Sequence, residues 1–210
     1  MKKLYQKIKD SIFICAACLS FLASIAFTQE NAANAQDDFA KFTKVKTIYS
    51  SFKIEKHIAI AEQPLISKGI FYFKSPDNLR WEYSFPFRYG FVIKGAKIIS
   101  WQDEDGRREI KDISSRTVMS AMIKQLYVFI AMDKEKISKV YKIKKSGIGI
   151  ILYPKDDSKD QEISDIAIEF AKNSAAIERV IISEKSGGKT VITFGGTKID
   201  GELPENAFEI

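Results

Sequence analysis

Hydrophobic and polar residues alternate along much of the chain from residue 52 onward. The first such stretch has Phe52, Ile54, Ile58 and Ile60 at hydrophobic positions, with charged or small residues beside them. A period of two places these side chains on one face of the backbone, which predicts a half-buried strand. The same pattern predicts further strands at about 65–74, 79–85, 89–93, 98–101 and 107–113.

Turn residues separate these predicted strands at short intervals. Ser75-Pro76-Asp77-Asn78 is a strong turn signal, because proline fixes φ and Asp and Asn tolerate turn geometry. Lys94–Lys97 and Asp103–Gly106 each contain a glycine between two predicted strands. Short strands joined by such turns predict an antiparallel meander.

Two stretches have a helical period instead. From Asp37 to Thr47 a hydrophobic residue recurs every three positions, which predicts a short helix. From Ser114 to Met132 a longer helix is predicted, with a serine at position 114 or 115 as its cap. The hydrophobic face of that helix comprises Val118, Met122, Leu126 and Phe129.

Strand patterns resume after this helix, near 139–144, 147–153, 163–170, 177–183 and 190–194. No internal repeat and no low-complexity linker divides the chain. We therefore expect a mainly β protein of the α+β class, built on one curved antiparallel sheet. With a few helices, we expect this sheet to form roughly a barrel or half-barrel.

The first 35 residues differ from the rest of the chain. Four lysines precede an apolar stretch from Ile12 to Phe27, and Ala33-Asn34-Ala35 follows as a small-x-small site. This order is typical of a secretory signal peptide, so we predict that residues 1–35 are removed and that residues 36–210 form the mature domain. Three alternatives stay open: cleavage after Ala26, a retained membrane anchor, and a lipoprotein signal centred on Cys18.

Composition limits the chemistry that the mature chain can perform. Hydrophobic residues make up 45% of the 210 residues and charged residues 29%, as in ordinary globular proteins. Both cysteines, Cys15 and Cys18, lie in the predicted signal peptide, which excludes a disulfide and a thiolate metal site from the mature chain. Losing the four lysines and two acids of that segment lowers the formal net charge from +6 to +4. Such a mild excess is no nucleic-acid signature, and we expect a monomer without nucleic-acid partners.

The residue pattern contains no recognisable catalytic constellation. His57 is the only histidine and lies on the polar face of its predicted strand. No Gly-x-Ser-x-Gly motif is present, and the acidic cluster Asp103–Asp105 lacks the downstream positions of a calcium loop. We therefore expect no enzyme activity, no metal and no cofactor, and a hydrolase is the least favoured function.

The densest aromatic stretch allows two interpretations. FYFKSPDNLRWEYSFP, from Phe71 to Pro86, holds six aromatic residues. Period two puts Phe71 and Phe73 on one face of the first strand, and the matching face of the second strand comprises Leu79, Trp81, Tyr83 and Phe85. These rings either fill an ordinary core, as aromatic residues in strands commonly do, or line a space for a ligand.

The same region resembles a known family. GIFYFKSPDNLRWEYSFPFRYGFVIKGAKIISW, residues 69–101, is similar to the signature region of the periplasmic lipoprotein carrier LolA and its relatives. The likeness extends to GIILYPK at residues 149–155 and to the closing DGELPENAFEI at residues 200–210. It implies an incomplete antiparallel barrel closed by helices around a hydrophobic cavity. In that family the cavity shelters lipoprotein acyl chains between the inner and outer membranes.

The resemblance also implies roles for individual residues. The implied cavity lining on the strands comprises Phe71, Phe73, Leu79, Trp81, Tyr83 and Phe85, and the implied helical lid contributes Met119, Met122 and Leu126. Lys74 and Arg80 are implied in gating or docking. Relatives often have Arg directly before the proline of the motif, whereas this chain has Ser75 there, so docking to the family's transporter stays open.

A periplasmic location and protein partners follow from the same resemblance. The implied partners are the inner-membrane lipoprotein-releasing ABC transporter and an outer-membrane acceptor, with lipoprotein acyl chains as the cargo. Alternatives on the same fold are a carrier of another lipid, a regulator that senses lipids or lipoproteins, and an acylated outer-membrane acceptor. The last alternative requires Cys18 to be the mature N-terminus.

Overall fold

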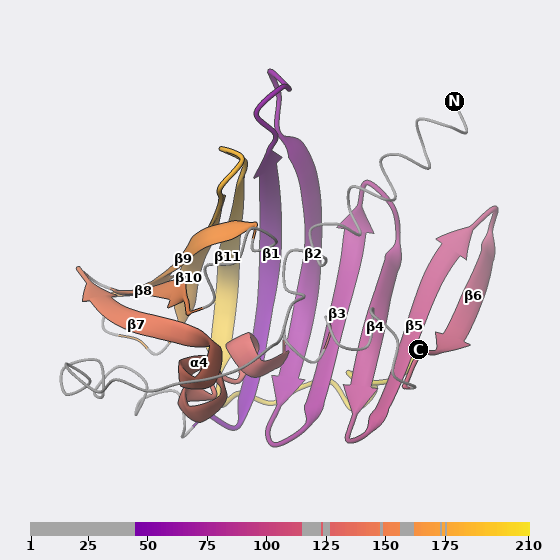
Figure 1. The fold of residues 1–210 in the computed structure, drawn as a ribbon. Helices are drawn as coiled ribbons and strands as arrows, with labels where there is room; N and C mark the ends of the chain where they lie inside the picture. Colours follow the sequence, from indigo (N-terminus) through magenta and orange to yellow (C-terminus); the bar gives the residue numbers. More distant parts are fainter. Residues whose placement is uncertain are drawn as a thin grey trace.

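The computed structural model describes residues 45–114, 123, 127–147, 149–155, 162–172, 174 and 176–210. An antiparallel sheet of eleven strands makes up most of this part of the chain (Figure 1). In chain order the strands are β1 Thr47–His57, β2 Leu65–Lys74, β3 Asn78–Phe85, β4 Tyr89–Lys94, β5 Lys97–Glu104, β6 Arg107–Asp112, β7 Tyr141–Ser146, β8 Gly149–Pro154, β9 Ile163–Phe170, β10 Ile177–Glu184 and β11 Lys189–Ile199.

The strand order shows how two meanders form one sheet. β1 to β6 follow one another across one half, and β7 to β11 follow one another across the other half. β1 pairs with β11 and thereby joins the halves, which leaves β6 and β7 at the two ends. The sheet bends strongly near its β7–β10 end but does not close (Figure 1). The expected mainly β class and incomplete barrel are confirmed.

Helices are short in the described part. Residues 127–130 are helical, and α4 spans Lys134–Val140. Asp133 caps α4, because its side chain accepts a hydrogen bond from the backbone N–H of Lys136. The sequence analysis missed α4 and predicted a strand from about residue 139, because Ile137 is the one buried residue in this lysine-rich helix.

The other expected helices are only partly within the described residues. Residues 37–44 of the first one lie outside them, and its predicted end at Thr47 is wrong because β1 begins there. Of the helix expected at 114–132, residues 123 and 127–130 are described as helical, whereas Met132 lies in a turn.

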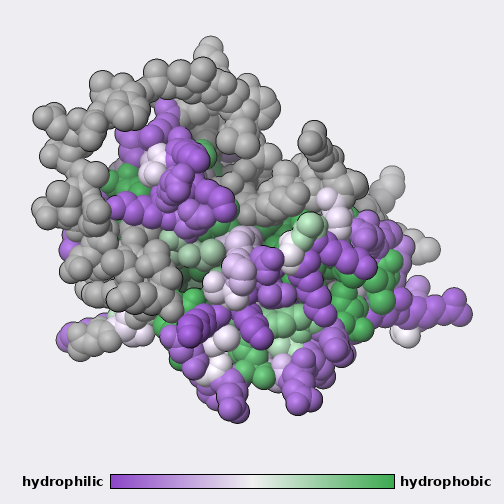
Figure 2. Space-filling model, turned by 90° about the horizontal axis from the view of Figure 1, so that it is seen from below, coloured by the Kyte–Doolittle hydropathy of each residue, from purple (hydrophilic) through white to green (hydrophobic). Residues whose placement is uncertain are grey.

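Two hydrophobic clusters hold the sheet and the helices together. We call the first the aliphatic cluster: its buried members are Met132, Ile137, Tyr141, Ile150, Leu152, Ile163, Ile166, Ile168, Phe170 and Ile182. We call the second the aromatic cluster: its buried members are Val45, Ile48, Phe52, Ile54, Phe71, Phe73, Leu79, Trp81, Ile93, Ile98, Ile123 and Ile130. In the view from below, hydrophobic residues show in several patches between hydrophilic ones on the described surface (Figure 2).

The helical residues 127–130 contact both clusters. Ile130 belongs to the aromatic cluster, and Tyr127 packs against it. Val128 and Phe129 pack against the aliphatic cluster. This one helical turn therefore connects the two halves of the hydrophobic interior.

The last ten residues, 201–210, form a C-terminal strap on the face of the sheet opposite the aromatic cluster. At its start the Thr47 hydroxyl donates a hydrogen bond to the carbonyl of Gly201. At its end the guanidinium of Arg80 donates to the carbonyl of Glu209. Since Arg80 and Trp81 are consecutive in β3, their side chains point to opposite faces. We call the face of Trp81 the inner face and the face under the strap the outer face.

Candidate functional site

Three aromatic rings from three neighbouring strands form a stack on the inner face. The ring of Phe52 in β1 lies 4.2 Å from that of Trp81 in β3, at an interplanar angle of 21°. The ring of Phe71 in β2 lies 5.4 Å from Trp81, at 18°. The indole therefore makes stacked contacts with two phenyl rings, an arrangement that is favourable beyond simple burial.

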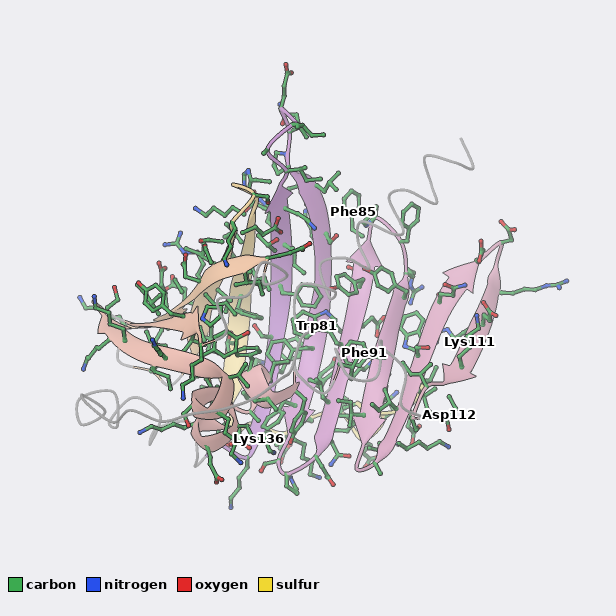
Figure 3. All side chains as sticks on the ribbon, in the orientation of Figure 1. Trp81, Phe85, Phe91, Lys111, Asp112 and Lys136 are labelled. Carbon is green, nitrogen blue, oxygen red and sulfur yellow. The ribbon has the colours of Figure 1, made fainter. Side chains whose placement is uncertain are left out.

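Further rings extend this stack along the sheet. Tyr83 meets Phe52 edge to face at 5.2 Å and stacks on Tyr89 at 4.3 Å. Phe91 in β4 packs against the same cluster and lies beside Trp81 in the middle of the sheet (Figure 3). The inner face of β1 to β4 is thus a continuous apolar wall, consistent with the strand register that pairs Trp81 with both Phe71 and Phe91.

A small hollow lies at the β1–β2 end of this wall, between the helical turn and strands β1, β2, β10 and β11. Its free volume is about 30 Å³, and its lining comprises Ile48, Phe71, Ile130, Ala176, Ile177, Phe194, Thr197 and Ile199. Seven of these eight residues are apolar. Pockets for small ligands usually measure about 300–1,000 Å³. The hollow can therefore hold an acyl chain only after the helical turn and the sheet move apart.

Two hydroxyl groups beside the hollow bond to each other. Ser50 is fully buried, and its hydroxyl lies 2.8 Å from that of the half-buried Thr197 and donates to the carbonyl of Ser51. The buried indole N–H of Trp81 differs from these two, because the described residues provide no acceptor for it. An unpaired buried donor is costly.

The structure brings together most of the residues expected to line a cavity. Phe71, Phe73, Leu79 and Trp81 are at most 5% exposed and belong to the aromatic cluster, and Tyr83 packs against it. Their role in ligand binding stays a prediction. Met119, Met122 and Leu126, the expected lid residues, lie outside the described residues.

Phe85 lies apart from the other predicted lining residues. Its side chain is 51% exposed, and it lies near the end of β3 away from Trp81 (Figure 3). The reason is an irregularity in the pairing of β2 with β3: Gly69 pairs with Tyr83, but the preceding Lys68 pairs with Phe85. An extra residue at this point breaks the alternation on which its placement was predicted.

The two residues expected in gating or docking lie in different surroundings. Lys74 is exposed at the end of β2, beside the turn at Ser75. Arg80 lies on the outer face, where its guanidinium donates to Glu82 at 2.7 and 2.9 Å and to the carbonyl of Glu209. Arg80 thus holds the C-terminal strap, while a docking role for either residue stays a prediction.

Sequence reasoning missed part of the aromatic wall. Phe52 and Phe194 were in predicted strands but were not assigned to the site, although they meet its rings at 4.2 and 5.6 Å. Their alternation with polar residues was a usable signal. The patterns within single strands did not reveal that β1 lies between β2 and β11 in the sheet.

Charged groups gather on the outer face around Trp101. The Arg108 guanidinium lies 4.2 Å from the centre of the Trp101 ring and donates to Asp103 at 2.8 Å. This hydrogen bond holds the pKa of Asp103 below its ordinary value of 3.8. Arg88 lies 3.7 Å from the same carboxylate. The outer face is therefore an ion-pair surface and the inner face an apolar one.

This division of polar and apolar groups leaves the inner face suited to an apolar ligand. Within the described residues, no group of three or more His, Cys, Asp or Glu side chains is placed to hold a metal ion. None of the described helices has the length and apolar character needed to cross a bilayer. The inner face offers stacked rings and aliphatic side chains, which suit the apolar part of a ligand.

Comparisons with solved structures agree on the fold. The complex of MucA and MucB from Pseudomonas aeruginosa contains a chain similar to this one, with a TM-score of 0.53 at 10% identity. The match covers 86% of this chain but 61% of that one, so this chain spans about three fifths of its length. A conserved protein from Thermus thermophilus has a TM-score of 0.53 at 9% identity, over 84% of this chain and 93% of that one. No curated protein matches the sequence.

The family comparison is more specific than the structural ones. The family described as "Outer membrane lipoprotein carrier protein LolA" matches residues 43–210, which include the whole described sheet and the C-terminal strap. That description is of a family of lipoprotein carriers. The chain belongs to the LolA family of outer membrane lipoprotein carrier proteins.

Proposed function

We propose that this protein binds lipoprotein acyl chains between the aromatic wall and the helical turn at residues 127–130, and carries them through the periplasm from the inner to the outer membrane. A carrier of another diacyl lipid would use the same site. Family membership supports a carrier, and the apolar inner face supports an acyl ligand.

The observation that carries the proposal is the small hollow between the wall and the helical turn. Ile130 lies on the helical side of this hollow, and Phe71 and Phe194 lie on the sheet side. Separating the two sides would expose apolar surface on both of them. That surface would be costly in water unless a ligand covered it.

The energetics of acyl transfer explain why such a surface is needed. At about 0.8 kcal/mol per buried CH₂, an acyl chain of about sixteen carbons is held in a bilayer by on the order of 10 kcal/mol. Escape into water is therefore very slow for cargo with several chains. A carrier must offer comparable apolar surface, and a wall of stacked rings beside a separable helical turn can do so.

The opening must be reversible, and the helical turn is placed for that. Tyr127 and Ile130 contact the aromatic cluster, whereas Val128 and Phe129 contact the aliphatic cluster. Moving this turn toward the aliphatic cluster would widen the hollow without unpairing a strand. We expect acyl chains to enter in this way.

Export and hand-over complete the proposed role. We expect cleavage after Ala35, a periplasmic location, loading from an inner-membrane lipoprotein-releasing ABC transporter and delivery to an outer-membrane acceptor. The mass of the exported protein tests the first step. A mature chain that begins at Gln36 agrees with the carrier, whereas an acylated Cys18 at the N-terminus would indicate a membrane-anchored acceptor.

The binding step is tested with a fluorescent diacyl lipid. Ile130→Phe adds volume at the hollow and should weaken uptake, whereas Ile130→Ala enlarges the hollow and should leave uptake equal or stronger. Ile110→Ala is the control, because it makes the same substitution as Ile130→Ala at a side chain that is 54% exposed. Its uptake of lipid should equal that of the wild type. Native mass spectrometry of protein taken from cells should show bound lipopeptide or lipid. A wild-type protein that takes up no lipid would refute the proposal.

A further inference from the structure

The indole N–H of Trp81 is a buried hydrogen-bond donor without an acceptor among the described residues. The side chain is 2% exposed, so water does not provide the missing acceptor at its surface. A phenylalanine would fill a stacked position without this cost. A ligand that supplies the acceptor would explain why this donor is buried without a partner from the protein.

The indole ring is held in place by its neighbours in the wall. It stacks on Phe52 at 4.2 Å and on Phe71 at 5.4 Å, so turning the ring to reach another acceptor would break both contacts. The buried neighbours Leu79, in the same strand, and Ile93, in β4, are aliphatic and have no side-chain acceptor.

Other polar groups in the same region do have partners. The hydroxyls of Ser50 and Thr197, on the strands that join the two halves of the sheet, bond to each other, and that of Ser50 also lies within hydrogen-bond distance of two backbone carbonyls. Acceptors are therefore present on the inner face, although none among the described residues reaches the indole of Trp81. We propose that the Trp81 indole N–H donates a hydrogen bond to the ester carbonyl of the bound acyl lipid.

The surroundings of Trp81 select the kind of acceptor. A carboxylate or phosphate would lose its hydration among apolar side chains, with no described cationic side chain in the aromatic cluster to compensate. An ester carbonyl is uncharged, accepts without donating, and is attached directly to an acyl chain. The chain can then run along the rings of Phe52 and Phe71 while its carbonyl meets the indole. This inference rests on the proposed function and adds a preference for ester-linked lipids.

The second tryptophan provides a matched control. Trp101 is also 2% exposed, and its Nε1 also has no acceptor among the described residues. It lies on the outer face, under the guanidinium of Arg108 and above Gly90. Trp101→Phe therefore removes a comparable buried N–H without touching the inner face.

The test compares dioctanoylglycerol with 1,2-di-O-octylglycerol, which has the same chains but ether links in place of esters. Wild-type protein and Trp101→Phe should bind the ester about 2- to 10-fold more tightly, the range expected for one net hydrogen bond. Trp81→Phe should bind both lipids equally. Each protein is judged by the ratio of its affinities for the ester and the ether lipid. A general loss of packing in Trp81→Phe weakens both affinities and therefore cancels in this ratio.

A second measurement requires no change at Trp81. The chain has two tryptophans, so a nitrogen-15 spectrum shows two indole N–H signals, and Trp101→Phe identifies the one from Trp81. The ester lipid should move the Trp81 signal downfield, and the ether lipid should not. Equal binding of ester and ether by wild-type protein, or an ester preference that survives in Trp81→Phe, would overturn the inference but leave the carrier proposal intact. Failure to bind either lipid would refute the carrier proposal itself.

Discussion

The rings of Phe52 and Trp81 stack 4.2 Å apart although a whole strand lies between the strands that carry them. Two strand spacings amount to about 9.6 Å, so the rings must lean toward each other over β2. They can do so because Gly69 stands between them on the inner face. A Cβ at Gly69 would lie 2.5 Å from Cζ of Phe52 and 2.0 Å from the carbonyl oxygen of Glu82.

Gly69→Ala should therefore disrupt the stack. The carbonyl of Glu82 is backbone and cannot move aside without shifting β3, so we expect a loss of about 1–3 kcal/mol in the free energy of unfolding. Urea unfolding followed by tryptophan fluorescence measures both the stability and the environment of Trp81. Lipid uptake should fall with the same variant, because Phe52 is pushed away from the wall.

Gly201→Ala is the control for this substitution. A Cβ at Gly201 would lie 3.9 Å from its nearest neighbour, which is ordinary contact. Its stability should stay within about 0.5 kcal/mol of the wild-type value. If Gly69→Ala were equally harmless, the close approach of Phe52 to this glycine would not matter for the wall.

The aromatic wall could be predicted where its contacts are local in sequence. Phe71 and Trp81 are ten positions apart and pair through the turn at Pro76, so period two and one turn signal place both rings. The contribution of Phe52 depends on β1 lying beside β2 and on a glycine between two rings. No pattern within a single strand reports such a relationship.

Other differences arose where the backbone departs from regular geometry. The strand predicted to end at residue 194 continues to Ile199, because Gly196 adopts a φ of 60° that accommodates the irregular pairing opposite Ser50. Phe85 was misplaced for a similar reason, since regular alternation fails at the irregularity in β3.

The ion pair of Asp103 with Arg108 should make stability depend on pH in the acid range. The hydrogen bond from Arg108 lowers the pKa of Asp103 below 3.8 in the folded protein. The pair therefore stabilises the fold above the unfolded-state pKa, and this contribution disappears as pH falls through the lower folded-state pKa. Asp103→Asn should cost less than about 1 kcal/mol at neutral pH, since both side chains are partly exposed.

Urea unfolding of wild type and Asp103→Asn at several pH values measures this dependence. The difference in unfolding free energy should shrink as pH falls below about 4. High salt at neutral pH should also reduce it, because salt screens partly exposed pairs. A difference that stayed constant down to strongly acid pH would show that the carboxylate charge is not responsible.

Burial of Tyr141 should appear in alkaline titration. Burial raises the pKa of its hydroxyl to about 12, and its ring meets Phe129 edge to face at 5.6 Å. The folded state thus disfavours the tyrosinate, so stability should decrease as pH rises from about 10 toward 12. Tyr141→Phe should remove one tyrosine that titrates near pH 12 from the ultraviolet absorbance curve and should lessen the alkaline loss of stability. An unchanged titration curve would place that hydroxyl in water.

The C-terminal strap should depend on Arg80, whose guanidinium binds both Glu82 and the carbonyl of Glu209. Arg80→Met keeps the aliphatic part of the side chain but removes these hydrogen bonds. The Glu82 side chain, which is 15% exposed, then has only Arg88, at 3.9 Å, of its two arginine partners among the described residues. We expect the free energy of unfolding to fall by about 1.5–3 kcal/mol. Once released, the strap would expose Ala207, which is 4% exposed in the fold. Carboxypeptidase should therefore trim this variant faster than wild type. Lys111→Met breaks a pair whose side chains are 62% and 50% exposed, and it should change neither stability nor trimming. Equal trimming of all three proteins would mean that other contacts hold the strap.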